Sequence, residues 1–320
     1  MPTRSEFWRG ILLALVAALL AMPGCYRKSG QKLIVVIVPS RENPFFRVEA
    51  DAAAARARQL GYAVRVEAHD DDSYKQDNLI DMALASNAAA IVLDNAGADS
   101  SVAAVRRAER AGIPCFLIDR EIHVTGIAQA QIIADNDQGA RLLAGEFAKE
   151  MRGAGPYAEL LGTESDTNAQ VRTHGFHAVL DQFPKLRLAA SASANWSQSE
   201  AYQKTETILE AHPEIQGILA GNDTMALGAA AAVKNAGIRN LHIVGFDGIP
   251  DALASIRSGG MQATVLQPAA EIARMAVDEV DRFLKTGSTG RPERQVVPCE
   301  LVTRANASEF EGFEHKQPLP

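Results

Sequence analysis

The chain has 320 residues, of which 47% are hydrophobic and 22% are charged, and its formal net charge is −7. This length and composition predict a globular protein of two domains of about 130 to 150 residues each. The net negative charge argues against a nucleic-acid partner, which requires a concentrated basic surface. The three cysteines lie far apart, which argues against a cysteine metal site or redox motif.

The N-terminus has the pattern of an export signal, which we assign to residues 1–24. Basic residues precede an apolar stretch, Gly10 to Ala21, that is too short to span a membrane comfortably. The sequence Met-Pro-Gly-Cys follows and resembles the bacterial lipoprotein box, with an unusual proline. We therefore expect Cys25 to be lipidated, with residues 25–32 as a lipidated N-terminal linker. The alternatives are cleavage nearby, or an uncleaved anchor with a basic flank.

From Leu33 onward, short apolar strands alternate with helices, which predicts parallel sheets covered by helices on both faces. Asn43 caps the first predicted helix, Pro44 is its first residue, and Gly61 ends it. The loops that follow these strands are polar. We predict strands at 33–38, 64–68, 90–93, 115–118 and 131–134, and helices at 44 to about 60, 74–85, 100–111 and 138–151.

A second, similar series follows without a low-complexity linker, so we predict two α/β lobes with a ligand between them. In this series an apolar strand runs into a glycine turn that carries Phe246 and Asp247. That turn lies at the carboxyl edge of the sheet, where open α/β sheets bind ligands. We predict strands at 157–161, 186–190, 218–220, 241–244, 261–266 and 296–302, helices at 169–182, 199–211, 224–235 and 269–284, and a loose tail from Ala305.

Carboxylates, amides, arginines and aromatic residues gather at the ends of the predicted strands. Carboxylates accept hydrogen bonds from hydroxyls, arginines donate them, and an aromatic face covers the C–H side of a polyol. Taken singly, each residue could form a surface ion pair, pack in the core or cap a helix. No nucleophile with a base and no phosphate-binding glycine loop is evident, so the set indicates recognition rather than catalysis. The set is Ser40, Asn43, Pro44, Phe45, Phe46, Asp94, Asn95, Asp119, Arg120, Arg172, Trp196, Asn222, Asp223, Phe246, Asp247 and Gln267.

Five motifs resemble, in order and spacing, those of the ribose-type periplasmic sugar-binding proteins, which are the type I solute-binding proteins of ABC importers. The motifs are NPFF, IDR, GNDTMALGA, VGFDGIPD and ATVLQ. The resemblance runs from Leu33 to about Val302. It implies an α/β fold of two doubly wound parallel-sheet lobes joined by a three-strand hinge. The N-terminal lobe would comprise residues 31–134 and 268–298, and the C-terminal lobe residues 135–267 and 299–320.

The same resemblance implies a sugar site that needs no cofactor, metal or catalytic residue. Phe45, Phe46 and Trp196 would form walls around the sugar ring. Asp94 replaces an asparagine that ribose-binding proteins usually carry, and this extra acceptor leaves other pentoses, hexoses and sugar alcohols open. The residues expected to hydrogen-bond the sugar hydroxyls are Asn43, Asp119, Arg120, Arg172, Asn222, Asp247 and Gln267.

Two other patterns invite a metal-site interpretation that we do not favour. His174 and His177 lie three residues apart on a predicted helix, but a third ligand is not apparent. Residues 70–72 are three aspartates without the ligand spacing of a calcium loop, so we expect a solvated loop that caps the next helix. We expect Cys115, which lies in an apolar run, and Cys299 to be buried free thiols.

The resemblance implies an exported, monomeric receptor that captures a monosaccharide or sugar alcohol and delivers it to an ABC permease with its ATPase. It would reside in the periplasm or cell envelope, lipid-anchored to the membrane. Presentation of the ligand to a membrane sensor or chemoreceptor is the main alternative. A LacI-type regulator would need a helix-turn-helix where the export signal stands. An exported carbohydrate enzyme would need paired carboxylates about 5 to 9 Å apart.

Overall fold

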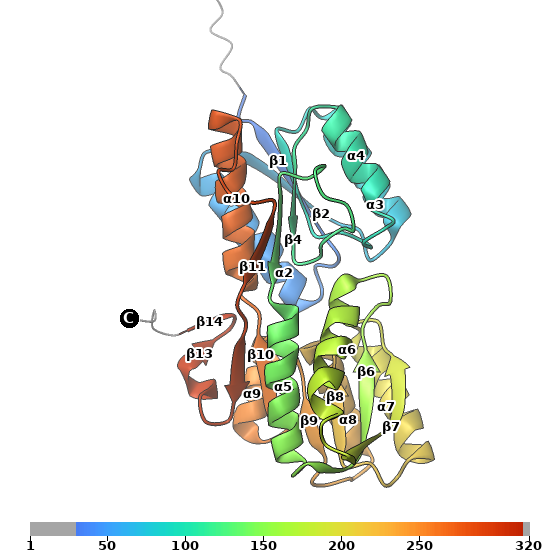
Figure 1. Ribbon diagram of the computed structural model, residues 1–320. Coiled ribbons are helices and arrows are strands. Elements are labelled where there is room, and N and C mark those ends of the chain that lie inside the picture. The colour runs from blue at the N-terminus through green and yellow to red at the C-terminus, as the bar shows by residue number, and fades with distance from the viewer. Residues whose placement is uncertain (1–29, 316–320) are drawn as a thin grey trace, which may run out of the picture. The chain divides into compact units, whose positions relative to one another are not determined.

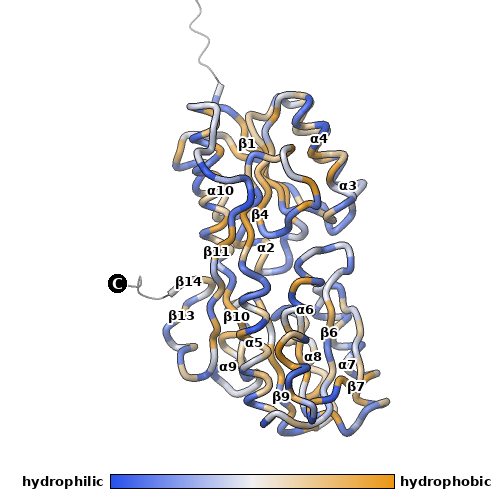
Figure 2. Tube along the Cα trace, in the orientation of Figure 1, coloured by the Kyte–Doolittle hydropathy of each residue, from blue (hydrophilic) through white to orange (hydrophobic). Residues whose placement is uncertain are grey.

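The computed structural model describes residues 30–315, and within this range the expected fold class is confirmed (Figure 1). Two α/β lobes are present, each built on a six-stranded sheet, with apolar strands in the interior of each lobe (Figure 2). Among the described helices, none combines the length and apolarity needed to cross a membrane. The expected signal peptide and Cys25 lie outside the described residues.

The first sheet is fully parallel and separates two apolar cores. Alternate residues of a strand point to opposite faces, so Ile34 and Val36 pack in one core while Val35 and Ile37 pack in the other. Helices α2 (Pro44–Gln59) and α10 (Ala269–Thr286) pack together on the first face, and α3 (Ser73–Ala85) and α4 (Val102–Arg110) contribute to the second. The strand order is β11 (Arg294–Val297), β5 (Ala130–Ala134), β4 (Cys115–Ile118), β3 (Ala90–Leu93), β1 (Leu33–Val38) and β2 (Ala63–Ala68).

The second sheet is parallel except for its edge strand β12, which runs antiparallel to β10. Its strand order is β12 (Glu300–Thr303), β10 (Ala263–Leu266), β9 (His242–Val244), β8 (Gly217–Ala220), β6 (Ala154–Leu161) and β7 (Lys185–Ser193). Helix α5 packs against α6, and α7 packs against α8. The helices are α5 (Asn136–Glu150), α6 (Thr167–Leu180), α7 (Gln198–Ala211), α8 (Asp223–Asn235) and α9 (Pro250–Ser258), the last of which was not predicted.

The chain passes between the two sheets three times within the described residues. The passages lie between β5 and α5, between β10 and α10, and between β11 and β12. The single strand predicted at 296–302 is therefore wrong, because it is two strands in different sheets. Pro298 separates them, since proline has no N–H to continue a ladder. At this passage Gln138 donates to the Cys299 carbonyl at 3.1 Å and accepts from its N–H at 3.0 Å.

The expectation of a loose tail from Ala305 is also wrong. The segment contains a 3₁₀ turn, η1 (Ala307–Glu309), and an antiparallel pair, β13 (Phe310–Glu311) and β14 (Glu314–His315). Phe310 and Phe313 are buried in the same core as α2, and the ring of Phe313 lies 6.0 Å from that of Phe45. Burial of these two phenylalanines contributes to holding the tail against the core.

We predict that Phe310→Ala lowers the free energy of unfolding by about 3 kcal/mol, because it leaves a cavity at a ring that is 1% exposed. Urea unfolding followed by circular dichroism measures this change. Tyr74→Ala is the matched control, since the Tyr74 side chain is 83% exposed. Equal stability of the two variants would show that the tail contributes nothing to the core.

Candidate functional site

A cavity lies where strand ends of both sheets face one another. Its free volume is only about 10 Å³, far below the roughly 300 to 1,000 Å³ of pockets for drug-sized ligands, so side chains of the two lobes nearly fill it. Each lobe supplies part of the lining from loops or helix starts that follow its strands. The lining residues are Phe45, Phe46, Asp119, Arg120, Asp166, Asn168, Arg172, Trp196, Asn222, Asp247 and Gln267.

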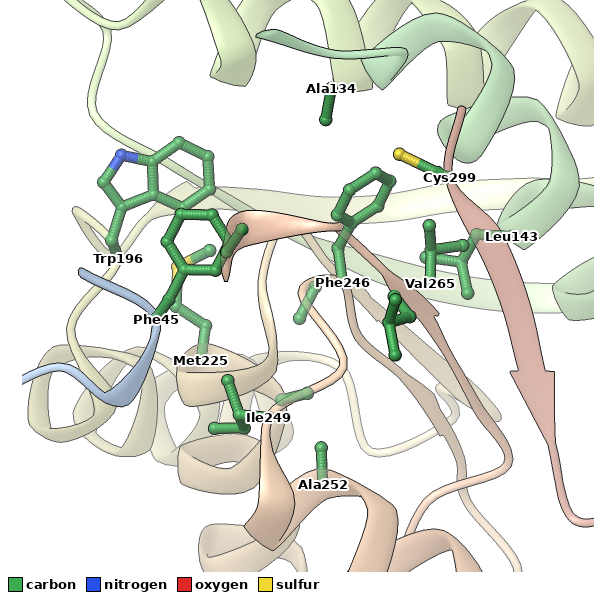
Figure 3. Packing of buried hydrophobic residues seen from close by; sticks show 14 of the residues in the cluster. Phe45, Ala134, Leu143, Trp196, Met225, Phe246, Ile249, Ala252, Val265 and Cys299 are labelled. Atoms are coloured by element: carbon green, nitrogen blue, oxygen red, sulfur yellow. The ribbon is translucent and has the colours of Figure 1, made fainter. Parts of the chain in front are cut away.

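The aromatic residues form the apolar walls of the cavity. Phe45 and Phe46 begin helix α2, and their rings meet edge to face at 5.5 Å. Trp196 is 7% exposed, and its Nε1 donates to Asp166 Oδ2 at 3.1 Å, which fixes the plane of the ring. Figure 3 shows Trp196 and Phe45 at the same end of the apolar cluster. Such flat faces suit the C–H side of a small polyol.

The Trp196 ring packs directly against Gly162, at the end of strand β6, and this close contact requires a glycine there. A Cβ atom added to Gly162 would lie 2.0 Å from Trp196 Cζ2, which is far inside van der Waals contact. Trp196 itself has a positive φ of 61°, a conformation that non-glycine residues rarely adopt. The backbone therefore places this ring at some conformational cost, which is typical of functional sites.

Arg172 organises the polar wall contributed by the C-terminal lobe. Its Nε donates to Asn136 Oδ1 at 2.7 Å, and its Nη1 donates to the Gly221 carbonyl at 2.8 Å and lies 3.4 Å from Asp247 Oδ1. Its guanidinium lies 4.0 Å from the centre of the Phe246 ring, a cation–π contact. Phe246 is fully buried and does not line the cavity, so its predicted role as a sugar-facing ring is corrected.

Asp247 stands at the turn after β9 with an unusual φ of 127°. Its Oδ1 accepts a hydrogen bond from Gln267 Nε2 at 2.8 Å, while Gln267 Oε1 has no donor among the described residues. Burial raises the pKa of Asp247 well above its ordinary value, and nearby Arg172 opposes this shift. Asp223 holds the turn, because its carboxylate accepts from the N–H groups of Gly248 and Ile249 at 2.7 and 2.9 Å.

Arg120 organises the polar wall of the N-terminal lobe and is 2% exposed. Its Nε lies 2.8 Å from Asp166 Oδ2 and its Nη1 donates to Asp71 Oδ1 at 2.7 Å. Burial first, and the Asp166 carboxylate second, raise the pKa of Asp119 to about 6. Asn168 Nδ2 donates to Asp119 Oδ1 at 3.1 Å. The pairs Arg120–Asp166 and Asp119–Asn168 thus join residues carried by different sheets.

Two of the expected ligand residues do not line the cavity. Asn43 caps α2, because its Oδ1 accepts from the Phe45 N–H at 3.0 Å, and it lines a wider groove outside the cavity. Asp94 is fully buried, with Oδ1 3.6 Å from Arg120 Nε. Asn222 lines the cavity and also caps α8 through the Met225 N–H. The Asp94 carboxylate therefore lies outside the cavity lining, next to the Arg120 side chain that does line the cavity.

Asp166 and Asn168 also line the cavity, although neither was among the residues expected from the sequence. Both follow β6, and Asp166 caps α6 by accepting from the Asn168 N–H at 2.8 Å. Their position after a strand was the available signal, but a polar run before a helix is also the ordinary pattern of a cap. Structure alone shows that the Asp166 carboxylate faces Arg120.

The residues with a possible metal pattern have other contacts. His177 lies 3.0 Å from Glu159 Oε2, and this contact raises the pKa of His177 to about 9. Asp72 caps α3, as expected, by accepting from the Tyr74 N–H at 2.8 Å. Cys115 and Cys299 are buried free thiols, which confirms that expectation.

Comparison with known proteins identifies the family. The model of the family described as "Periplasmic binding protein domain" matches residues 34–289. The chain belongs to this periplasmic binding protein family. The match confirms the resemblance on which the expected fold rested.

Two similar curated relatives are D-apiose import binding proteins. That of Paraburkholderia graminis is 53% identical over 281 residues, which cover 88% of this chain and 90% of the relative. That of Actinobacillus succinogenes is 48% identical over 304 residues, which cover 95% of this chain and 98% of the relative. A solved periplasmic solute binding protein of an ABC transporter from Actinobacillus succinogenes, with bound D-allose, is 27% identical, has a TM-score of 0.82, and matches over 88% of this chain and 100% of its own.

We predict that Gly162→Ala displaces the Trp196 ring, because the added methyl group occupies its place. With Trp8 replaced by phenylalanine, Trp196 is the single tryptophan of the chain. Its fluorescence emission should then move to longer wavelength as the ring meets water. Gly145→Ala is the matched control, since a Cβ at Gly145 meets nothing within 4 Å. An unchanged spectrum in the Gly162 variant would contradict the described packing.

Proposed function

We propose that the protein is an exported solute-binding protein that captures a monosaccharide between its two lobes and delivers it to an ABC permease with its ATPase. The cavity carries this proposal. It combines aromatic walls with donors and acceptors from both lobes, and Gln267 Oε1 and Arg120 Nη2 lack hydrogen-bond partners among the described residues. Buried polar groups are nearly always hydrogen-bonded, so unmatched donors and acceptors in one cavity suit a polyhydroxylated ligand.

D-apiose is the sugar that we propose as ligand. Two relatives that match almost their whole length carry this function, at 53% and 48% identity. The donors, acceptors and aromatic faces that line the cavity support a monosaccharide as ligand. We propose that the protein performs no reaction on the sugar.

Ligand capture would work by closure of the lobes around the cavity. The proposed lobes are residues 31–134 with 268–298 and residues 135–267 with 299–320, and sheet membership supports this division. Three parallel connections restrict motion to bending and twisting about one region. A sugar that contacts both lobes favours the closed state, because only there are both sets of contacts made. The pairs Arg120–Asp166 and Asp119–Asn168 would break on opening.

We also propose that the protein acts as a monomer held at the cell envelope by lipid on Cys25. The support is the position of this cysteine directly after the apolar segment of the export signal. An anchor of this kind would keep the lobes in water while holding them near a membrane permease.

The proposed function predicts that the purified protein binds D-apiose in isothermal titration calorimetry, and more tightly than D-ribose or D-allose. The released sugar should be chemically unchanged after incubation. Failure to bind any monosaccharide would overturn the function, and preference for another sugar would overturn the ligand.

Asp247→Asn tests the site within the same measurement. Asparagine keeps the shape of the side chain, but it replaces the carboxyl group that faces Arg172 with a neutral amide. We expect at least about a tenfold loss of affinity, the value of one hydrogen bond to a charged group. Asp99→Asn is the control, because the Asp99 side chain is 86% exposed. Wild-type affinity in the Asp247 variant would remove this residue from the site.

The proposed anchor predicts that Cys25→Ser releases the protein from membranes into the soluble fraction. Serine has no thiol to carry a thioether-linked lipid, while the export signal before it is intact. Fractionation of cells and immunoblotting measure the distribution. A Cys115→Ser variant should stay with the membrane, since Cys115 is a buried thiol of the first sheet. Membrane association of both variants would contradict the lipid anchor.

A further inference from the structure

Three buried carboxyl groups gather at the N-terminal-lobe wall of the cavity. Glu49 comes from α2, Asp94 follows β3 and Asp119 follows β4, and one carboxyl oxygen of each lies within 4.8 Å of the others. Glu49 and Asp94 are fully buried, and Asp119 is 3% exposed. Only Asp119 among them lines the cavity. The sequence analysis did not include Glu49 among the site residues.

A second observation links this cluster to the ligand. Arg120 lines the cavity, and its Nε lies 3.6 Å from Asp94 Oδ1 of the cluster. Its Nη2 is buried and has no hydrogen-bond acceptor among the described residues. An unmatched guanidinium donor in the cavity lining is a place for a sugar oxygen. The direction in which Nη2 points depends on the groups that hold the rest of the Arg120 guanidinium, among them Asp94.

The carboxyl groups of Glu49 and Asp94 lie close together in this cluster, with one oxygen of each within 4.8 Å of the other. Two ionised carboxylates are both acceptors, so a hydrogen bond between them needs a proton on one of them. If Glu49 and Asp94 are both ionised, their carboxylate oxygens accept no hydrogen bond from any of the described residues. Burial first, and then the neighbouring carboxylates, raise the pKa of Glu49 well above its ordinary value, and Arg120 opposes this shift.

The charged surroundings of the pair come from several elements. His69 follows β2 and donates from Nε2 to the Asp94 carbonyl at 2.8 Å. Burial lowers the pKa of His69 to about 4, so it adds no charge at neutral pH. Asp71, Asp119 and Asp166 add negative charge, and Arg120 is the cation among the groups that act on Asp94. If both Glu49 and Asp94 were ionised, the second negative charge would be repelled by more neighbouring carboxylates than the single arginine could offset.

We propose that Glu49 and Asp94 share one proton and act as a positioning pair for the sugar site, holding Arg120 with Nη2 directed into the cavity. With the proton in place, the pair carries one negative charge and Asp119 stays available as an ionised acceptor. Loss of the proton adds a charge that draws Arg120 toward Asp94 and away from the ligand. This inference rests on the proposed function, and it predicts that sugar affinity falls as pH rises through the pKa of the pair.

The same proton affects stability in a defined direction. Because the folded pKa of the pair is raised, the protonated form favours the folded state. This contribution is fully present below the ordinary carboxyl pKa and is lost as pH rises through the raised value. The thermal stability of the wild type should therefore decline on the alkaline side in parallel with sugar affinity.

Calorimetric titration with D-apiose between about pH 6 and about pH 9, a range above the ordinary carboxyl pKa, tests the pair. In Glu49→Gln, the amide donates permanently to Asp94, so affinity at neutral pH should stay within about threefold and the alkaline decline should disappear. In Glu49→Leu, the donor is lost and affinity should fall about tenfold. Glu279→Gln is the control, since Glu279 is a buried acid with a raised pKa on α10 that does not line the cavity.

An alkaline decline that is unchanged in Glu49→Gln, or wild-type affinity in Glu49→Leu, would overturn the proposal. Infrared spectroscopy supplies a readout that needs no sugar. The C=O stretch of a protonated carboxyl group should be present at neutral pH and should lose intensity in Glu49→Gln and in Asp94→Asn, but not in Glu279→Gln. Absence of this change would overturn the shared proton. A wild type that binds no sugar but shows this change would refute the proposed function and retain the proton pair.

Discussion

Burial of two arginines where the sheets meet is the constraint on which the rest of the site depends. A buried guanidinium is costly unless carboxylates and carbonyl groups surround it with good geometry. Arg172 obtains these partners from Asn136, Gly221 and Asp247, and Arg120 obtains them from Asp71, Asp94 and Asp166. The last of these comes from the other sheet. Neutralisation of Arg120 is thus tied to the approach of the two lobes.

The two arginines differ in how fully their guanidinium groups are matched by partners within the protein. Arg172 stacks on the buried Phe246 ring and is held by one lobe, so it is prepared before any ligand arrives. Arg120 combines a partner across the cavity with an unmatched Nη2. Preorganisation on one side and adjustable charge on the other suit a receptor that must bind firmly and still release its cargo.

Much of this arrangement could be predicted from sequence because parallel strands direct their carboxyl ends to one edge. Asp119, Arg120, Asn222 and Asp247 each follow a short apolar strand, and all four line the cavity. Asp94 obeys the same rule, yet its carboxylate lies outside the cavity lining, next to Arg120, and strand position does not define that direction. Phe246 failed for the same reason, since an aromatic residue at a strand end can face either the ligand or the core.

Other features had no local signal. Glu49 lies among alanines and charged residues of α2, a composition typical of a solvated helix face, and only the packing of α2 on the sheet makes it buried. The folded tail depended on two phenylalanines that meet a distant core. In both cases the deciding contact lies far away in the sequence. The split of the last predicted strand differs, because Pro298 within it was a local signal against one continuous strand.

The bond pair between Gln138 and the backbone of Cys299 has a mechanical consequence. The side-chain amide of Gln138 hydrogen-bonds both the N–H and the carbonyl of Cys299, as the backbone of a neighbouring β-strand would. The first turn of α5 and the start of β12 are thereby fastened into one rigid piece. In the closure proposed above, rotation at the third connection would then fall on the peptide units around Pro298, on the first-sheet side of these two hydrogen bonds.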